Sequence, residues 1–371
     1  MIPLSLYVHF PWCVRKCPYC DFNSHEVKNG IPEDEYLAAL MRDLEAALPQ
    51  VWGRTVQTVF IGGGTPSLLS PAGLDRLLAG VRSRLTLAPT AEITLEANPG
   101  AIEAEKFAAF RAAGVNRLSL GIQSFDDAKL KALGRIHSSA EAKRAVDLAL
   151  RHFERVNLDL MYALPGQTLA EARRDIETAI AFGPGHLSAY HLTIEPNTAF
   201  HHAPPPVPDD DLAADMQEMV EDTLAAAGYR HYETSAFAKP GQQCRHNLNY
   251  WHFGDYLGIG AGAHSKISDH AGIRREARPR SPKDYLADPA TRLWQPVALS
   301  DLPGEFMMNA LRLTEGVPID WFAERTRLPL AGIADMLARA EADGLLMHTG
   351  ERIAPTPLGQ RHLNALIGRF F

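Results

Sequence analysis

The sequence predicts an α/β protein: a partial parallel (β/α) barrel of the TIM type, followed by a winged-helix-like α/β domain. From residue 1 to about 195, short apolar runs alternate with amphipathic stretches, as in βαβ units with buried parallel strands. Polar residues gather at the carboxyl ends of the apolar runs, where barrel enzymes keep their active sites. After residue 296 the pattern changes to helices, a hairpin and a final helix. These observations favour an open or closed barrel over a Rossmann sheet.

The barrel is predicted from six apolar runs and the amphipathic stretches between them. The apolar runs are expected to form strands at 4–10, 58–61, 92–96, 117–120, 157–160 and 186–191. The amphipathic stretches predict helices at 32–48, 71–85, 104–113, 139–153 and 169–182. Strands joined by helices in this way run parallel, so their carboxyl ends meet at one edge.

A proline-rich segment ends this alternating part of the chain. Residues 202–208 contain four prolines, which exclude a helix or a paired central strand. The aspartates at 209–211 suit the start of a helix running to about residue 227, and 229–237 predicts a strand or an edge hairpin. A glycine-rich stretch at 254–264 and a basic loop at 274–280 come next, with a boundary near 280–300. We expect three domains: a partial barrel at 1–200 with a cysteine loop at 11–23, an extension at 201–295 that completes the barrel, and a winged-helix-like domain at 296–371.

The carboxyl-terminal domain has the element order of a winged helix. Helices are expected at 304–313, 319–326 and 330–343, strands at 345–348 and 352–355, and a last helix at 357–367. The third helix would enter DNA, but it carries Asp335, Arg339, Glu341 and Asp343, for a net charge of −2 (1 − 3). A helix that enters a DNA groove should be basic. We interpret this domain as a lid or an interaction domain.

Composition narrows the class of protein. With 46% hydrophobic and 22% charged residues, the chain is typical of a globular protein. No apolar run approaches the about 18 residues that a membrane span needs. A formal charge of −7 argues against a nucleic-acid partner. Four cysteines in 371 residues, and a strand at the start with no leader ahead of it, predict a reduced, cytoplasmic protein.

Three cysteines lie within eight residues after the first predicted strand. The spacing C-x3-C-x2-C joins Cys13, Cys17 and Cys20. Three thiolates on a 4Fe-4S cluster would leave one iron open to bind a small chelating ligand. A disulfide between two of these cysteines would leave the third thiol unpaired, since the remaining cysteine, Cys244, lies 224 residues beyond Cys20 (244 − 20). Zinc would need His9 or His25 as a fourth ligand, although structural zinc sites usually draw on two separated pairs of ligands.

Glycines follow the second predicted strand directly. The segment 62–66 reads Gly-Gly-Gly-Thr-Pro, and glycine lets backbone amides approach a ligand closely. A tight turn would explain the run equally well. It does not match the phosphate-binding loop of NTPases.

Polar side chains end the later strands. Glu96, Gln123, Ser124 and Asp159 lie in or just after apolar runs. Because a buried carboxylate without a partner costs several kcal/mol, two of them at matching strand ends indicate a shared polar ligand. The alternative is structural ion pairs with Arg117, Arg135 or Arg155.

Through these residues the chain resembles a radical S-adenosylmethionine (SAM) protein. The resemblance rests on the cysteine triplet with Tyr19 before its last cysteine, the glycine run and the polar strand ends. More narrowly, the chain resembles the oxygen-independent coproporphyrinogen III oxidase family. The further matches are the winged domain and the segments YVHFP at 7–11, GIQSF at 121–125 and LPGQT at 164–168. The resemblance spans nearly the whole chain.

The resemblance implies two cofactors and the residues that hold them. Cys13, Cys17 and Cys20 would ligate a 4Fe-4S cluster, and its open iron would take the amino and carboxylate groups of SAM. Eight residues would line the SAM site: Tyr7, Gly63, Gly64, Thr65, Glu96, Gln123, Arg135 and Asp159. Their chemistry agrees, because glycine backbone suits the amino acid part, carboxylates suit ribose hydroxyls or ammonium, and arginine suits a carboxylate.

Two departures from the oxidase pattern point to one branch of the family. Phe22 stands where the oxidase has a fourth cysteine, and the oxidase's amino-terminal extension is missing. Both favour the oxidase-like branch whose members bind heme and are regarded as heme chaperones. That branch carries an H-N-x-x-Y-W signature, present here as His246, Asn247, Tyr250 and Trp251. Histidine can ligate heme iron and aromatic rings can pack on the macrocycle, although a structural histidine also fits. Cys244 is a second candidate ligand.

We therefore predict a heme-binding radical SAM protein that passes heme to an unidentified acceptor protein. The alternative is an oxidase that decarboxylates porphyrinogen propionates with a 5′-deoxyadenosyl radical. A third interpretation is a regulator acting through the winged domain. An electron donor such as flavodoxin or ferredoxin is expected if SAM is cleaved. Nucleic acid is not an expected partner, and a membrane is expected only through partner proteins. SAM cleavage, the axial heme ligand and the oligomeric state stay open.

Overall fold

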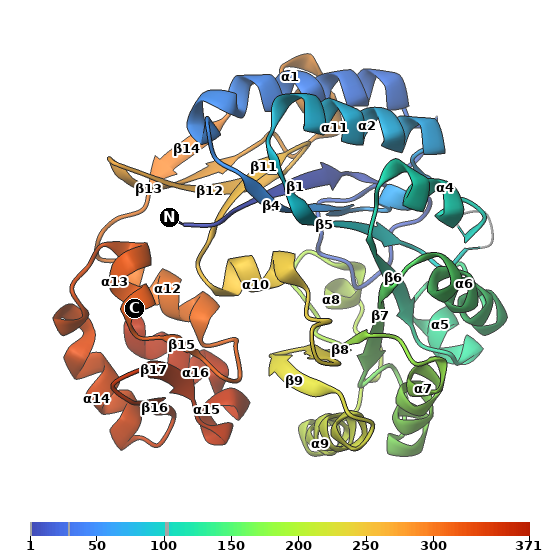
Figure 1. Ribbon diagram of the computed structural model, residues 1–371. Helices are drawn as coiled ribbons and strands as arrows, with labels where there is room; N and C mark the ends of the chain where they lie inside the picture. Colours follow the sequence, from blue (N-terminus) through green and yellow to red (C-terminus); the bar gives the residue numbers. More distant parts are fainter. Residues whose placement is uncertain (1, 29, 101–103) are drawn as a thin grey trace.

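The computed structural model describes residues 2–28, 30–100 and 104–371. Its main feature is a curved sheet of twelve strands in the order β14-β13-β12-β11-β1-β4-β5-β6-β7-β8-β10-β9 (Figure 1). Seven central strands, from β11 to β8 in that order, run parallel. Among the described residues no pairing joins β9 to β14, so the sheet stays open. The predicted partial parallel barrel is confirmed.

The strands of this sheet fall into a parallel centre and two antiparallel ends. The parallel strands are β1 (Leu4–Phe10), β4 (Val56–Gly63), β5 (Leu87–Ala97), β6 (Arg117–Gln123), β7 (Arg155–Tyr162), β8 (His186–His191) and β11 (Asp255–Ile259). The antiparallel strands are β9 (Arg230–Glu233), β10 (Ala236–Ala238), β12 (His264–Asp269), β13 (Gly272–Ala277) and β14 (Leu293–Pro296).

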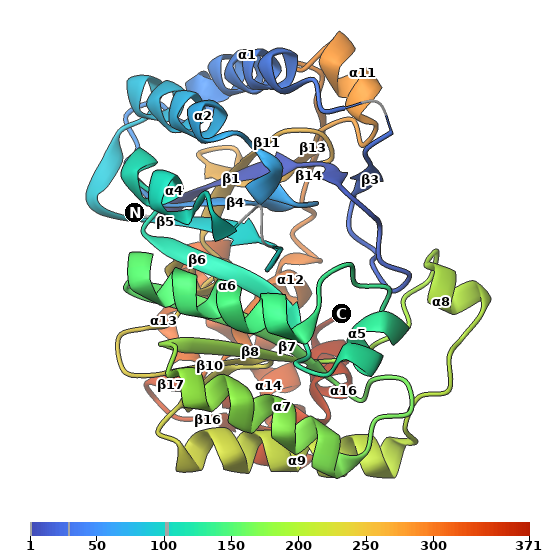
Figure 2. The same cartoon turned by 90° about the vertical axis from the view of Figure 1, so that its right-hand side faces the viewer.

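Helices cover the outer, convex face of the sheet (Figures 1 and 2). They are α1 (Glu33–Val51), α2 (Pro71–Arg84), α4 (Phe107–Ala113), α6 (Ser139–His152), α7 (Leu169–Phe182) and α9 (Asp210–Ala226). Their buried sides form one apolar core with the parallel strands. Because the central strands are covered on both faces, they read in the sequence as continuous apolar runs.

Local signals fix where several of these helices begin and end. The side chains of Ser138 and Glu141 form a capping box at the start of α6, and Thr168 and Glu171 form one at the start of α7. Gly183 ends α7 with a φ of 72°, a left-handed conformation that suits glycine.

Short helices lie in the connections between the main elements of the barrel, and a separate set of elements forms the carboxyl-terminal domain. The short helices are α5 (Asp127–Ala132), α8 (Ala199–His202), α10 (Arg245–Trp251) and α11 (Pro282–Ala287). The carboxyl-terminal helices are α12 (Leu302–Ala310), α13 (Asp320–Thr326), α14 (Ala334–Ala342), α15 (Pro357–Arg361) and α16 (Leu363–Ile367). With β15 (Val317–Pro318), β16 (Leu346–His348) and β17 (Arg352–Pro355) as a small sheet, they surround a second core. Phe253 and Ile273 join that core from the barrel side.

A buried ion network fixes the segment after β11 to α1. Asp43 of α1 accepts hydrogen bonds from Arg278 Nε (2.9 Å), the Tyr285 hydroxyl (3.0 Å) and the Gly260 amide (3.1 Å). The side chains of Asp43 and Arg278 are both fully buried. Burial raises the pKa of Asp43, and Arg278 opposes that rise. The network therefore anchors the turn that leads into β12.

Some expectations need correction. The basic stretch predicted as a loop at 274–280 is largely strand β13, because it pairs with β12 and β14. The glycine-rich stretch contains the seventh parallel strand, β11, which the apolar pattern did not predict. The helix predicted at 357–367 is two helices separated at His362. The short helix α5 was not predicted.

The apolar runs were too short to predict a membrane span. Consistent with this, none of the helices in the described ranges is both long and apolar enough to cross a membrane.

Candidate functional site

The cysteine loop lies over the carboxyl ends of the parallel strands. It leaves β1, and its short strands β2 (Trp12–Cys13) and β3 (His25–Glu26) pair with each other. Helix α8 lies beside it, where the Phe200 amide donates to the Pro18 carbonyl at 3.0 Å (Figure 2). The three free thiols of Cys13, Cys17 and Cys20 are half-buried and line one cavity of about 390 Å³. The loop thus brings the triplet and the strand ends together.

The thiols have different neighbours. Cys17 Sγ accepts from Arg135 Nη1 at 3.6 Å, and Cys20 Sγ lies 3.6 Å from Ser24 Oγ. In the described part of the chain, no three His, Cys, Asp or Glu side chains converge to hold a single metal ion. A 4Fe-4S cluster does not need such convergence, because each thiolate binds a different iron. The donor set and its spread fit a cluster with one open iron better than mononuclear zinc.

The glycine run packs against the first turn of the cysteine loop. The Gly64 amide donates to the Phe10 carbonyl at 2.7 Å, and a side chain at Gly64 would collide with the Trp12 carbonyl. Gly63 has a φ of 115°, and its amide donates to Glu96 Oε2 at 3.0 Å. Glycine is therefore required here by close backbone approach as well as by conformation.

Two carboxylates face the cavity from neighbouring parts of the sheet. Glu96 ends β5, and Asp159 in β7 accepts from Ser119 Oγ (3.0 Å) and Asn157 Nδ2 (2.8 Å). Burial, with Asp159 nearby, raises the pKa of Glu96 to about 7. Burial also raises the pKa of Asp159, while Asn157 and Ser119 oppose that rise. A cation bound between these groups would relieve both effects.

The ion pairs proposed as an alternative do not form. In the described residues neither Glu96 nor Asp159 has an ion-pair partner, and Arg155 instead pairs with Glu92 at 3.1 Å. Arg135 Nη2 donates to Asn98 Oδ1 (2.7 Å) and to the Gly121 carbonyl (2.8 Å). The buried Nε of Arg135 has no hydrogen-bond partner in the described structure. Two carboxylates and one guanidinium atom are thus available to a ligand.

Gln123 reaches the same cavity from an unusual backbone conformation. Its φ of 68° is positive, and the pairing of β6 with β7 shifts register between Gly121 and Gln123. Positive φ at a residue other than glycine carries a conformational cost that is often found at functional sites. The bulge turns the Gln123 side chain into the cavity that Thr65 and the cysteines line.

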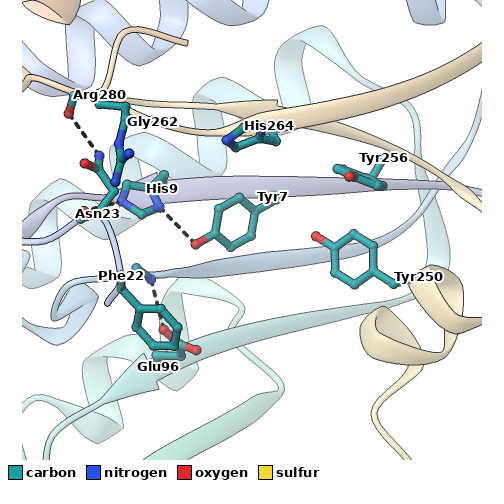
Figure 3. Close-up of a pocket in the computed structure, with 11 residues that line it drawn as sticks. Tyr7, His9, Phe22, Asn23, Glu96, Tyr250, Tyr256, Gly262, His264 and Arg280 are labelled. Atoms are coloured by element: carbon teal, nitrogen blue, oxygen red, sulfur yellow. Dashed lines mark hydrogen bonds between the residues drawn. The ribbon is translucent and has the colours of Figure 1, made fainter. Parts of the chain in front are cut away.

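A second cleft of about 480 Å³ adjoins the first (Figure 3). Its lining includes Tyr7, His9, Asn23, Tyr250, Tyr256, Gly262, His264 and Arg280. Phe22, Gly63 and Glu96 line both cavities, so the two cavities meet at these residues. The structure places Tyr7 in this second cleft, whereas the other seven residues expected to contact SAM line the first.

Hydrogen bonds organise one side of the second cleft. The Tyr7 hydroxyl lies 3.0 Å from His9 Nδ1, and His9 Nε2 lies 2.9 Å from the Asn23 carbonyl. Asn23 Nδ2 donates to the carbonyls of Ala261 and Arg280, each at 2.9 Å. Burial lowers the pKa of His9, which favours the neutral imidazole. The end of the cysteine loop is therefore tied to the segment around β12.

The H-N-x-x-Y-W signature forms helix α10, and its residues face two ways. His246 is 1% exposed; its Nδ1 lies 2.8 Å from Thr58 Oγ1 and its Nε2 3.0 Å from the Tyr250 hydroxyl. Burial lowers the pKa of His246 to about 3. Tyr250 lines the second cleft (Figure 3). Trp251 packs against the carboxyl-terminal core.

Two further residues that were predicted to take part in heme binding, Asn247 and Cys244, lie away from the cleft. Asn247 is half-buried on α10. Cys244 is buried, and its Sγ lies 3.8 Å from Glu92 Oε1. Neither residue is part of the cleft lining.

Sequence reasoning missed several residues that the fold brings to these cavities. Asn98, which orients Arg135, follows Glu96 by two residues, and its place at a strand end was a usable signal. Tyr256 lies on the parallel strand β11, and His264 and Arg280 come from the antiparallel extension that follows it; the apolar pattern predicted neither part. A single histidine such as His264, in a segment to which no strand was assigned, does not by itself indicate a binding site.

Comparison with known protein families matches the two parts of the chain separately. The model of the radical SAM superfamily matches residues 7–179. The model of the HemN C-terminal domain matches residues 297–362.

Similar proteins match over the full length. The heme chaperone HemW of Escherichia coli is 51% identical over 99% of this chain and 98% of the relative. The heme chaperone HemW of Bacillus subtilis is 35% identical, also over 99% of this chain and 98% of the relative. Among solved structures, coproporphyrinogen III oxidase (HemN) from Escherichia coli has a TM-score of 0.84 at 24% identity, covering 100% of this chain and 90% of that one. The last match supports the fold alone.

Proposed function

Because the chain belongs to the radical SAM superfamily, and within it to the family of the heme chaperone HemW, we propose that it binds heme and passes it to an acceptor protein. The observation that carries this proposal is the full-length similarity to relatives with that name. The geometry agrees with it, since an aromatic cleft adjoins the cysteine-lined cavity. We propose that this activity takes place in the cytoplasm.

The cysteine-lined cavity would hold the two radical SAM cofactors. Cys13, Cys17 and Cys20 would ligate a 4Fe-4S cluster, which supplies an open iron and one-electron chemistry. Spread thiols and close-packed glycine backbone support this assignment.

The SAM ligand would lie over the strand ends. Glu96 and Asp159, which lack ion-pair partners among the described residues, would receive the cationic and hydroxyl groups of SAM. Arg135 would bind its carboxylate through the unpartnered Nε. Gly63, Gly64, Thr65 and Gln123 would complete the site. Tyr7 would act from the neighbouring cleft, next to Gly63 and Glu96, which line both cavities.

Heme would occupy the second cleft. Tyr250 would pack against the macrocycle, because large aromatic rings suit a flat apolar ligand. His246 would hold the Tyr250 hydroxyl in place through its 3.0 Å hydrogen bond. Asn247 and Trp251 would support the helix from its other side, where Trp251 meets the carboxyl-terminal core.

The partners follow from these assignments. An acceptor protein would take the heme from the open side of the cleft. If SAM is cleaved, the cluster would need an electron donor such as flavodoxin or ferredoxin. Contact with a membrane would come through such partner proteins.

Heme titration of anaerobically purified, cluster-reconstituted protein tests the proposal. We expect a saturable Soret band, and its absence would contradict heme binding. Transfer is tested by mixing heme-loaded protein with an apo heme protein in increasing excess. A transfer rate that rises with acceptor concentration indicates direct hand-over, whereas a constant rate indicates dissociation into solvent and argues against a chaperone. Conversion of coproporphyrinogen III to protoporphyrinogen by the same protein would favour the oxidase alternative.

A further inference from the structure

Three histidines lie in or directly behind the second cleft, and only one of them has a free ring. Both ring nitrogens of His9 have partners, Tyr7 and the Asn23 carbonyl. Both nitrogens of His246 have partners as well, and its ring is buried. His264 begins β12 with an exposed side chain, and its ring has no hydrogen-bond partner among the described residues.

The other side chains in the cleft are poor iron ligands. The Tyr7 and Tyr250 hydroxyls are engaged by histidines, and the Tyr256 hydroxyl accepts from Arg275 Nη1 at 3.0 Å. Burial raises the pKa of all three tyrosines, which keeps them as neutral phenols. No cysteine is part of the cleft lining in the described structure. By this comparison His264 is the side chain best placed to bind iron.

We propose that His264 is the axial ligand of the heme iron and that Arg280 binds a heme propionate. This inference rests on the proposed function and names the residues that perform it. Imidazole nitrogen is a common proximal ligand of heme iron. His264, Tyr7, Tyr250 and Tyr256 face one space in Figure 3, with Arg280 on the side of Asn23.

Charge in the cleft suits a porphyrin with carboxylate side chains. The Arg280 guanidinium is exposed and forms no ion pair within the described residues. Of the other two arginines near His264, Arg275 is bound to Glu305 and Tyr256, and Arg278 is buried in its ion pair with Asp43. A planar guanidinium binds a carboxylate with two parallel hydrogen bonds. Arg280 is therefore the cation left free for a propionate.

The backbone holds His264 in a fixed position. His264 pairs with Ala277 on the neighbouring strand. The turn before it is anchored where the Ala261 amide donates to the Tyr36 hydroxyl at 3.0 Å. A ligand on a rigid strand loses little conformational entropy on binding. Since His264 and Arg280 are both exposed, the bound heme would remain partly open to solvent, which suits a carrier that must release it.

Heme titrations of four proteins test the proposal: the wild type, H264A, H264Q and the control H270A. His270 is an exposed histidine on the turn after the same strand and is not part of the cleft. We expect H264A and H264Q to lose the absorption spectrum of histidine-ligated heme and to bind ferric heme at least tenfold more weakly than wild type. H270A should behave like wild type. Added imidazole should restore the wild-type Soret position in H264A, because it refills the vacated coordination site.

A second arm compares heme with its dimethyl ester. Wild type should bind the ester more weakly than heme, whereas R280Q should bind both equally. If wild type shows no Soret band, the proposed function itself fails. If wild type binds heme and H264A keeps its spectrum and affinity, only the present assignment is overturned. Failure of imidazole to restore the spectrum of H264A would likewise contradict axial ligation by His264.

Discussion

Replacing Glu96 with glutamine should stabilise the cofactor-free protein while weakening SAM binding. Glu96 lies near a second carboxylate, that of Asp159, and has no ion-pair partner in the described residues. Burial and this neighbour raise the pKa of Glu96 to about 7. The folded state therefore binds more protons at this position than the unfolded state between pH 4.5 and about 7. For this group, stability is greatest at low pH and declines as pH rises through that window.

The magnitude follows from the pKa shift. Raising the pKa from 4.5 to about 7 costs the ionised folded state on the order of 3 kcal/mol, at about 1.4 kcal/mol for each tenfold change. Because Glu96 is half-buried at a cavity that water can enter, we expect about 2 kcal/mol after screening. Glutamine keeps the shape and the acceptor for the Gly63 amide but removes the charge.

Urea unfolding of cluster-free protein provides the assay. E96Q should be about 2 kcal/mol more stable than wild type near pH 8, and nearly all of this advantage should be gone near pH 4, below the ordinary pKa of 4.5. The matched control is E177Q, which changes an exposed glutamate on α7 and should leave stability unchanged. In cluster-loaded protein, E96Q should bind SAM at least roughly tenfold more weakly, since a charge-assisted bond is worth about 1.5–3 kcal/mol. An equal advantage at both pH values, or none near pH 8, would refute the reasoning.

Three further predictions concern the cluster and the scaffold. C17A should lose cluster loading, measured as iron and acid-labile sulfide per chain, while C244S keeps it; full loading in C17A contradicts the ligand assignment. H246L should lower the free energy of unfolding in urea by about 1–3 kcal/mol, because it removes the partner of the Tyr250 hydroxyl and one of the two partners of the Thr58 hydroxyl, which keeps Ser5; an unchanged value would count against that ring as a structural support. D43N should cost up to about 3 kcal/mol, because the buried Arg278 then keeps only Glu276 as an ion-pair partner, and D43N/R278M should recover part of that loss; equal losses argue against a coupled pair.

Elements with local signals were predictable from the sequence. Helix α7 was predicted at its observed bounds, because a capping box at Thr168 and a glycine at 183 mark its two ends. The cysteine-lined cavity was predictable for a related reason. The carboxyl ends of parallel strands converge, so Glu96, Gln123 and Asp159 had to meet once their strands were identified.

Elements that depend on distant partners were not predictable. Strand β12 and the residue after β13 carry Lys266 and Arg278 at buried positions, which breaks the apolar pattern of a covered strand. Lys266 is compensated by Asp255 at 3.2 Å and Arg278 by Asp43, the latter 235 residues away in the chain. No local window contains that information. The second cleft, which this region helps to build, was hidden for the same reason.

The residues shared by the two cavities have a thermodynamic consequence. Phe22, Gly63 and Glu96 line both of them. If occupation of the cysteine-lined cavity changes the charge or position of Glu96, it changes the affinity of whatever enters the neighbouring cleft. Linkage makes this effect reciprocal: the factor by which SAM alters heme affinity equals the factor by which heme alters SAM affinity. A single carboxylate that lines both cavities is thus sufficient to couple the binding of SAM to the binding of heme.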